Sequence, residues 1–209
     1  MAMLATMRTL SRGGSLVRIR MDEAFARHTL RGKVVDVGGG RSPSYLRYFK
    51  RDSATIEPVD GSISGIDFEK DPLPYKDGSV DTVICANVLE HIYNYRFVVG
   101  EIRRILKPGG TLVGFVPFLI QYHPDPHDYF RYTKESLVRI FTEAGFMQVE
   151  IRTVGGGPFS ANFSNLVLSV PRPLRGLLYV PYAFLDALFL RLRPAARERY
   201  PLGYTFYVS

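Results

Sequence analysis

A short apolar run that stops at three consecutive glycines is the feature that most constrains this chain. Residues 33–37 (KVVDV) are rich in β-branched side chains and give way to Gly38-Gly39-Gly40. A run of this kind, bounded by glycines, is typical of a buried strand that enters a tight turn. Glycine has no Cβ, so such a turn can adopt positive φ angles and lets a ligand approach the backbone closely.

Strands and helices alternate along much of the chain. Further strands are predicted over residues 54–59, 80–85, 111–117, 147–154 and 203–208, and helices over 16–30, 43–50, 94–106 and 133–144. Strands that alternate with helices form crossover units, which build a largely parallel sheet between helices. The predicted fold class is therefore α/β, with helices on both faces of the sheet.

Composition limits the class of protein and the cellular location that this fold can have. The chain has 209 residues, of which 46% are hydrophobic and 22% charged, as in ordinary globular proteins. The single cysteine, Cys85, excludes a disulfide framework and favours a reducing, cytoplasmic location. We find no run of 18 uncharged apolar residues, so we expect no standard membrane-spanning helix. Residues 1–20 carry positive charge but no apolar core of signal-peptide length.

Acidic residues stand at the ends of two predicted strands. Asp36 comes just before the glycines, and Asp60 ends the second strand, where a carboxylate can accept both hydroxyls of a ribose. Glu57 is the competing candidate, because strand ends are uncertain by ~2–4 residues. A dinucleotide fingerprint would need a third glycine where Pro43 stands. An acid before the glycines instead suits a ligand that bears an amine.

Six ordered blocks extend this pattern: VVDVGGG, PVD, IDFEKDPLPYKDGSVD, NVLEHI, EIRRILKPGGTL and VPF. Their succession resembles the class I S-adenosylmethionine-dependent methyltransferases, in particular the methyltransferase type 11-like group with its ubiquinone-type and other small-molecule methyltransferases. The likeness spans about residues 33–154, and residues 204–208 fit the last strand of the family. It implies a Rossmann-like sheet of seven mostly parallel strands, with the last strand inserted antiparallel between two others. It also implies S-adenosylmethionine as cofactor.

The resemblance assigns a role to each residue that it matches. The residues implied to bind the cofactor are Asp36, Gly38, Gly39, Gly40, Asp60, Asp67, Phe68 and Asn87. Those from Asp36 to Gly40 would hold the methionine end, and Asp60 would bind the ribose hydroxyls. Asp67 would bind the adenine amine with Phe68 beside the ring, and Asn87 would form the wall near the sulfonium.

The segment HPDPHDYFRY over residues 123–132 follows the fifth predicted strand, at the sheet edge where ligands of open α/β sheets bind. His123, His127 and Asp128 could supply a general base near neutral pH. Two other interpretations stay open. His123, Asp125, His127 and Asp128 could hold a metal, but a proline-broken loop lacks a defined ligand geometry, so we expect none. Alternatively, His127 and Asp128 only cap the next helix and fix the loop.

The pair Glu90-His91 within NVLEHI is ambiguous in the same way. In the family pattern His91 lies near the cofactor edge. We expect it to support the turn rather than to take part in catalysis.

The late segment 155–200 differs in character from the rest. By the resemblance it is a helical insertion between the sixth and seventh strands, where relatives have a short hairpin. Residues 176–192 are apolar on almost every face and carry four aromatics with flanking arginines: Tyr179, Tyr182, Phe184, Phe189, Arg172, Arg175, Arg191 and Arg193. This composition suits a helix in a membrane interface over residues 172–193. A helix pair that caps the substrate pocket, or a homodimer contact, is the alternative.

Net charge adds to this asymmetry. The chain carries a net charge of +7. Residues 1–33 and 158–199 are both strongly basic, and the remaining residues carry a small net negative charge. Basic ends of this kind favour an anionic surface such as lipid headgroups or nucleic acid, although a solvated basic face without a partner fits equally well. A nucleic-acid methyltransferase is disfavoured, because the proline-proline-tyrosine type of block is missing and the charge sits among apolar residues.

We therefore expect one domain over residues 1–209. Its parts are an N-terminal helical segment (1–32), a cofactor-binding core (33–154), the insertion (155–200) and a terminal strand (201–209). The expected function is methyl transfer to an oxygen or nitrogen atom of a small-molecule, lipid-linked or glycan-linked acceptor. The alternative is a module of the same fold that binds the cofactor or a partner without turnover. The expected location is cytoplasmic, and a peripheral contact with a membrane stays open as one of the alternatives for residues 172–193.

Overall fold

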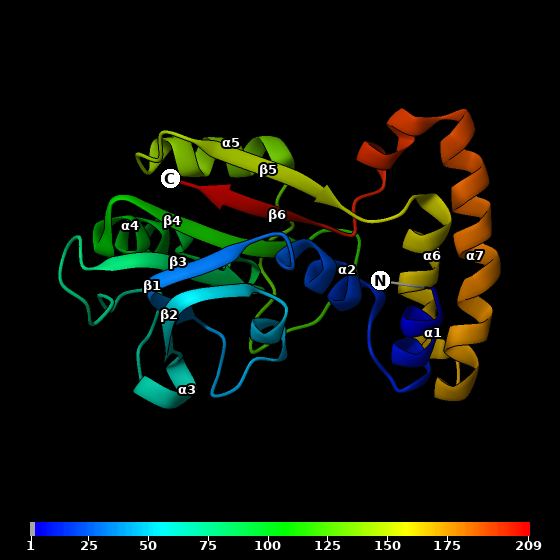
Figure 1. The fold of residues 1–209 in the computed structure, drawn as a ribbon, viewed down its shortest axis with the longest axis horizontal. Coiled ribbons are helices and arrows are strands. Elements are labelled where there is room, and N and C mark those ends of the chain that lie inside the picture. The colour runs from blue at the N-terminus through cyan, green and yellow to red at the C-terminus, as the bar shows by residue number, and fades with distance from the viewer. Residues whose placement is uncertain (1–2) are drawn as a thin grey trace.

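A six-stranded sheet forms the centre of the computed structural model, which describes residues 3–209 (Figure 1). The first two residues of the predicted N-terminal segment lie outside the described residues. The strands follow the spatial order β2-β1-β3-β4-β6-β5. They are β1 (Thr29–Val37), β2 (Lys50–Val59), β3 (Val80–Ala86), β4 (Leu106–Pro117), β5 (Val149–Val154) and β6 (Gly203–Val208). β6 pairs antiparallel with both β4 and β5, and the other pairs are parallel.

The predicted α/β class and the antiparallel last strand are thus confirmed. The sheet has six strands among the described residues, rather than the seven that the family resemblance implies. Between β2 and β3 the chain forms only the short helix α3 (Gly61–Ser64) and turns. Pro72, Pro74 and Gly78 make this stretch rich in turn residues, which is why it adds no strand outside β2.

Helices cover both faces of the sheet. α4 (Tyr95–Ile105) and α5 (Lys134–Glu143) cover one face. On α4 the buried residues Val98, Val99, Ile102 and Ile105 follow the helical period, so one apolar stripe faces the strands. α2 (Leu16–Phe25) packs on the other face, where Phe25 stacks on Phe49, the residue just before β2.

Three element boundaries differ from the sequence prediction. β1 begins at Thr29, inside the helix predicted over residues 16–30, and β2 begins at Lys50, inside the helix predicted over 43–50. Only a 3₁₀ turn, Ser44–Arg47, remains of that second helix, and a further one, Leu89–His91, follows β3. The cause is tertiary: Thr29 pairs with Lys50, and this pairing extends two strands into polar sequence. β4 likewise begins at Leu106 and continues through the glycines that were predicted to separate helix from strand.

The helical insertion between the last two strands is confirmed. It comprises α6 (Pro158–Leu166), a 3₁₀ turn (Val167–Ser169), α7 (Arg172–Leu192) and a second 3₁₀ segment (Pro194–Arg199). α7 packs against both α6 and α1 (Met3–Ser11) at one end of the molecule (Figure 1). Asp186 of α7 is buried and accepts hydrogen bonds from the backbone N–H groups of Phe159 and Ser160, at 3.0 and 2.7 Å. The helix α7 therefore caps the N-terminus of α6.

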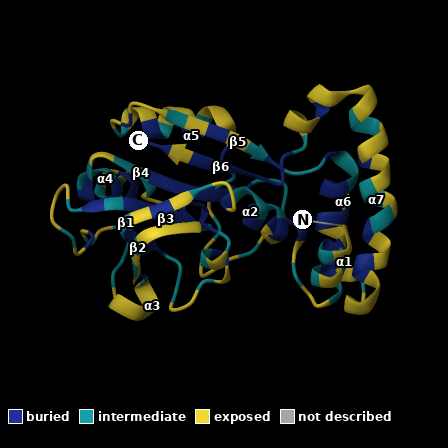
Figure 2. Ribbon diagram, viewed as in Figure 1, coloured by how far each residue is buried: buried dark blue, intermediate teal, exposed yellow. Residues whose placement is uncertain are grey.

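α7 is also long and apolar enough to cross a bilayer, judged by length and composition alone. The expectation that the chain has no helix of this kind is therefore corrected. Among its buried side chains, Tyr179 bonds Arg20 of α2 and Asp186 bonds the N-terminus of α6, whereas Arg175 donates to the carbonyl of Val170. The outward face of the helix is exposed (Figure 2).

Candidate active site at the carboxyl ends of the strands

A cavity of about 1170 Å³ lies where the loops after β1, β2, β3 and β4 meet. These loops leave the carboxyl ends of parallel strands, which is the edge where open α/β sheets bind their ligands. Seven of the predicted cofactor residues line this one cavity: Gly38, Gly39, Gly40, Asp60, Asp67, Phe68 and Asn87. The structure thus brings together residues that lie up to 49 positions apart in the sequence.

Asp36, the eighth predicted cofactor-binding residue, lies directly beneath the glycine turn and is fully buried. Its Oδ1 accepts a hydrogen bond of 2.7 Å from the hydroxyl of Tyr45, and its Oδ2 has no hydrogen-bond partner among the described residues. A Cβ on Gly39 would lie only 2.2 Å from Oδ2, so the turn passes directly over this oxygen. Burial raises the pKa of Asp36 to about 7, against the lowering effect of the bond from Tyr45. An orphaned carboxylate oxygen beneath a glycine turn fits a ligand ammonium group.

Asp60 connects the first two loops. Its Oδ1 accepts the N–H of Ser62 at 2.8 Å and caps α3, while its Oδ2 accepts the N–H of Gly40 at 3.2 Å. Oδ1 also accepts the hydroxyl of Ser62, whereas Oδ2 has a second lone pair, which leaves room for a hydroxyl donor from the cavity. The competing candidate Glu57 is ion-paired with Lys33 and is not among the residues that line the cavity.

Asp67 and Phe68 form the side of the cavity that follows. The N–H of Glu69 donates to Oδ1 of Asp67 at 3.0 Å, and this bond, together with the nearby Lys70, lowers the pKa of that carboxyl. Phe68 packs against the core beneath it. An ionised acid beside an aromatic ring matches an amine-bearing heterocycle.

Asn87 stands at the end of β3 with a φ of +56°, in the left-handed region that non-glycine residues seldom occupy. Its backbone N–H donates to the carbonyl of Phe115 at 2.9 Å, and its side-chain amide approaches the sulfur of Met21 at 3.3 Å. Unusual backbone of this type concentrates at functional sites.

The three predicted base candidates all lie in the loop after β4, but only one of them lines the cavity. His127 lines the cavity, whereas His123 and Asp128 are not among the lining residues. Asp128 accepts hydrogen bonds from the guanidinium of Arg131 with both oxygens and from the N–H of His123 at 2.9 Å. The bonds from Arg131 hold the pKa of Asp128 at about 2. This geometry favours the interpretation that Asp128 fixes the loop, while Thr133, and neither His127 nor Asp128, caps α5.

Sequence reasoning missed several residues of this site. Tyr45 carries no periodic signal that would link it to Asp36. Tyr93 and Tyr129 line the cavity with their rings 5.4 Å apart, and the ring of His127 lies 5.2 Å from that of Tyr129. The aromatic run over residues 129–132 was the available signal for this wall. The described residues also bring three metal-donor side chains together, and this set, Glu90, His91 and His123, differs from the one weighed in the sequence.

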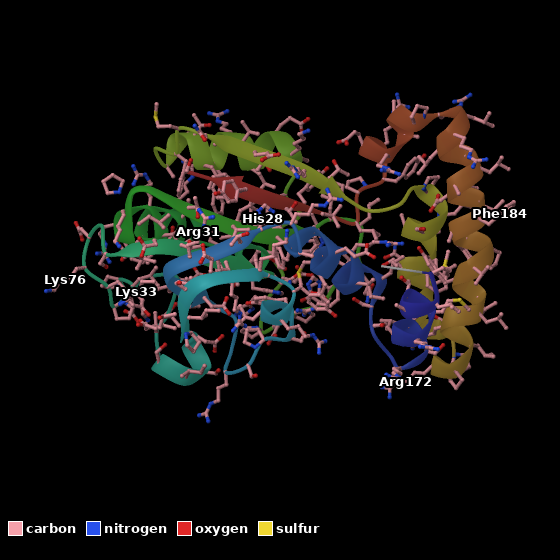
Figure 3. The ribbon with its side chains drawn as sticks, viewed as in Figure 1. His28, Arg31, Lys33, Lys76, Arg172 and Phe184 are labelled. Carbon is pink, nitrogen blue, oxygen red and sulfur yellow. The ribbon has the colours of Figure 1, made fainter. Side chains whose placement is uncertain are left out.

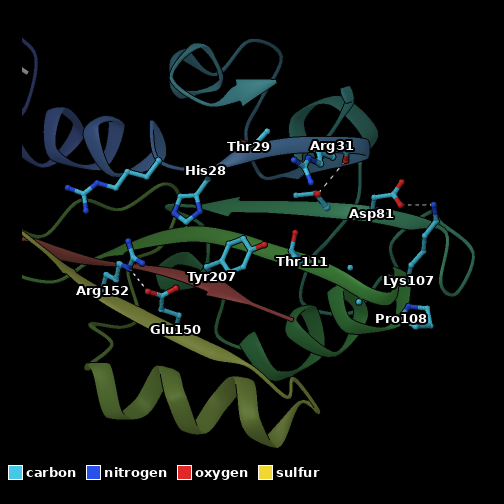
Figure 4. Close-up of a pocket in the computed structure, with 14 residues that line it drawn as sticks. His28, Thr29, Arg31, Asp81, Lys107, Pro108, Thr111, Glu150, Arg152 and Tyr207 are labelled. Carbon is cyan, nitrogen blue, oxygen red and sulfur yellow. Dashed lines mark hydrogen bonds and ion pairs between the residues drawn. The ribbon is translucent and has the colours of Figure 1, made fainter. Parts of the chain in front are cut away.

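A second cavity, of about 660 Å³, lies at the opposite edge of the sheet (Figure 4). His28 stacks on Tyr207 there, and two cations on its wall are ion-paired, Lys107 with Asp81 and Arg152 with Glu150. None of the predicted site residues lines it. We therefore place the candidate active site at the carboxyl edge.

Part of the chain resembles known methyltransferases. A family model described as a methyltransferase domain matches residues 35–114, the stretch from β1 to β4. A probable S-adenosylmethionine-dependent methyltransferase of Mycolicibacterium smegmatis is 33% identical over 76 residues, which cover 35% of this chain and 30% of that protein. A demethylmenaquinone methyltransferase of Lactococcus lactis is 27% identical over 123 residues, covering 44% of this chain and 49% of that protein. The chain thus spans less than half the length of these curated relatives.

Solved structures share the fold. Phosphoethanolamine N-methyltransferase 2 of Haemonchus contortus, in complex with S-adenosyl-L-methionine, superposes with a TM-score of 0.56 at 15% identity. The match covers 94% of this chain and 52% of that one. At this identity the likeness concerns the fold alone.

Proposed function

Because this chain belongs to the class I S-adenosylmethionine-dependent methyltransferases, with S-adenosylmethionine as cofactor, we propose that it methylates an oxygen or nitrogen atom of a small-molecule, lipid-linked or glycan-linked acceptor. One observation carries this proposal: the glycine turn, Asp60, Asp67 and Asn87 line a single cavity with Asp36 directly beneath it.

The bound cofactor supplies a methyl group on a sulfonium sulfur, which an acceptor lone pair displaces in line while the acceptor loses a proton. The chain's contribution is then to bind, orient and exclude water. In this proposal Asp36 and the glycine turn hold the methionine end, Asp60 holds the ribose hydroxyls, and Asp67 with Phe68 holds the adenine. Orientation of this kind can lower a barrier by about 7–11 kcal/mol.

The acceptor side of the cavity is aromatic. Tyr93, His127 and Tyr129 form a wall of adjacent rings, which suits a planar or partly apolar acceptor. His127 is the base candidate that lines the cavity, so in this proposal His127 accepts the proton that the acceptor loses. One distant relative is named as a demethylmenaquinone methyltransferase.

A lipid-linked acceptor also gives a role to the outward face of α7. Seven large apolar side chains of this helix are exposed: Leu174, Leu177, Leu178, Phe184, Leu185, Leu188 and Leu192. Most of them recur every three or four residues along one stripe, and Phe184 projects away from the body of the molecule (Figure 3). Arg172 and Arg191 lie near the two ends of the helix. We propose that this stripe contacts an anionic lipid surface, where leucines enter the interface and arginines meet headgroups.

Calorimetry with S-adenosylhomocysteine tests the cofactor assignment. We expect binding to the wild type and a loss of about 10–100-fold in affinity for Asp60→Asn, since a hydrogen bond to a charged group contributes roughly 1.5–3 kcal/mol. Asp52→Asn, at an exposed acid of the same strand, is the matched control and should bind like the wild type. Transfer of a labelled methyl group to lipid and glycan extracts then tests turnover. Binding without transfer to any extract would favour the non-catalytic alternative.

Flotation with vesicles tests the lipid contact. The probe is a vesicle of 70% phosphatidylcholine and 30% phosphatidylglycerol. We expect the double variant Phe184→Glu, Leu188→Glu to lose most of its vesicle-bound fraction, and Val138→Glu, at an exposed apolar residue of α5, to keep it. Equal binding of all three proteins would refute the contact. A dimer in sedimentation that only the double variant loses would instead support a homodimer interface.

A further inference from the structure

Glu90 is a fully buried carboxylate in the 3₁₀ turn that follows β3. Neither of its side-chain oxygens has a hydrogen-bond partner among the described residues. Burial of an unpaired carboxylate is costly, and native proteins compensate it with a cation or with several donors. Arg131, a cation of the loop after β4, donates to Asp128, to carbonyl groups and towards Nδ1 of His123, at 3.4 Å, rather than to Glu90.

Two imidazoles face this carboxylate. Nε2 of His91 lies 3.7 Å and Nε2 of His123 lies 3.9 Å from the same oxygen, Oε1 of Glu90. The three donor atoms lie within 4.8 Å of one another, and the two rings meet edge to face at 5.2 Å. His91 follows Glu90 directly, whereas His123 comes from the loop after β4, so the fold brings this set together.

The outer nitrogens of both rings are held in place. Nδ1 of His91 lies 2.5 Å from the carbonyl oxygen of His127, which can only accept, so Nδ1 carries the proton. The lone pair of neutral His91 is then on Nε2, where it faces a carboxylate oxygen. Nδ1 of His123 lies 3.2 Å from the carbonyl of Gln121 and 3.4 Å from Oδ2 of Asp128. A second partner of this type on the outer nitrogen is the usual arrangement of metal-bound histidines.

From this geometry we infer that Glu90, His91 and His123 bind a divalent first-row transition-metal ion. Two imidazoles and one carboxylate suit Zn²⁺, Fe²⁺ or Co²⁺ better than Mg²⁺ or Ca²⁺, which prefer all-oxygen ligands. Metal bonds of about 2.0–2.2 Å in tetrahedral geometry separate the ligand atoms by roughly 3.3–3.5 Å. Nε2 of His91 and Nε2 of His123 lie 3.7 and 3.9 Å from Oε1 of Glu90, and the whole set lies within 4.8 Å, so the side chains must move closer by up to about 1.5 Å to bind the ion.

The site would keep open coordination positions, because the protein supplies three ligands. His91 also lines the candidate active-site cavity, so these positions are next to the space proposed for the acceptor. This last step rests on the proposed function: an ion there would select an acceptor that offers an oxygen ligand. The metal site itself stands on the three side chains alone.

Titration of the protein with Co²⁺ and Zn²⁺ tests the site, on full-length protein purified without a histidine tag and treated with EDTA. We expect one equivalent of either ion, with visible Co²⁺ absorption bands of a nitrogen-ligated ion, and weaker binding of Mg²⁺. Glu90→Gln and His123→Ala should each lower Zn²⁺ affinity at least 10-fold. His28→Ala, at a histidine of the other cavity, is the matched control and should bind like the wild type.

Binding of S-adenosylhomocysteine to each variant reports whether it is folded and tests the cofactor assignment separately. Should Glu90→Gln fail to fold, His123→Ala, with its partly exposed ring, still decides the question. No bound ion in a wild type that binds S-adenosylhomocysteine would overturn the inference and leave the methyltransferase proposal intact. Equal Zn²⁺ affinity in His123→Ala and the wild type would overturn it too.

Discussion

The hydroxyl of Tyr45 donates a hydrogen bond of 2.7 Å to Oδ1 of Asp36, one layer beneath the glycine turn. The partner oxygen Oδ2 has no hydrogen bond, and burial raises the pKa of this carboxyl to about 7. The acid therefore holds its proton in the folded protein across a range in which it is ionised in the unfolded chain. This difference makes stability depend on pH.

The expected direction follows from the raised pKa. The contribution of Asp36 is fully present below its unfolded value of 3.8 and is lost as the pH rises through about 7. Asp36→Asn keeps the neutral shape and removes the titration, so its free energy of unfolding should fall less than that of the wild type between pH 5 and pH 8. The full effect is on the order of 4 kcal/mol. Urea denaturation at both values, without cofactor, measures it. Equal slopes for the two proteins would contradict the assignment, and Asp52→Asn serves as the exposed control.

The close approach of Gly39 to Asp36 gives a second prediction. A Cβ at position 39 would lie 2.2 Å from Oδ2 of Asp36 and 2.6 Å from the hydroxyl of Tyr45. Gly39→Ala should therefore destabilise the protein by about 1–3 kcal/mol, as overpacking does, and weaken S-adenosylhomocysteine binding more than 10-fold. Gly100 in α4 has open space around it, so Gly100→Ala should stabilise by about 0.5–1 kcal/mol. Thermal unfolding and calorimetry compare the two. A Gly39→Ala protein as stable as the wild type would show that the turn does not press on Asp36.

Asn87 allows backbone and side-chain effects to be separated. Its φ of +56° favours glycine, so Asn87→Gly should keep the stability of the wild type within about 0.5 kcal/mol, and Asn87→Ala should lose about 1 kcal/mol or more. If the side chain contacts the cofactor, both variants should lose the same factor in S-adenosylhomocysteine affinity. If instead only the destabilised variant Asn87→Ala loses affinity for S-adenosylhomocysteine, the role of Asn87 is purely structural.

The cap that Asp186 provides for α6 gives a fourth prediction. Asp186→Ala leaves the N–H groups of Phe159 and Ser160 without their acceptor in a buried position. We expect a loss of about 2–4 kcal/mol, and a smaller one for Asp186→Asn, which keeps one carbonyl acceptor. Chemical denaturation measures both, with the exposed Asp52→Ala within about 0.5 kcal/mol of the wild type. A neutral Asp186→Ala would mean that α6 and α7 are not coupled in this way.

Local patterns in the sequence determined the fold class, the glycine turn and most of the cavity wall. β-branched runs bounded by glycine or proline identify strands locally, and the carboxyl ends of parallel strands share one edge, so Asp60 could be placed at that edge before the structure was known. The family resemblance added Asp67 and Asn87, and all three line the one cavity. The helical insertion was implied by the family resemblance, which expects only a short hairpin where residues 155–200 stand.

Tertiary structure decided the rest. Strand pairing drew Thr29 and Lys50 into β1 and β2 against their local pattern, because a backbone hydrogen-bond ladder does not depend on side-chain type. The contact between Tyr45 and Asp36, the cap from Asp186 to α6, and the meeting of His123 with Glu90 join segments that no periodicity relates. Whether a buried carboxylate lies within hydrogen-bond distance of a donor depends on how loops that are distant in the sequence pack together. The sequence pattern alone does not determine the distance between them.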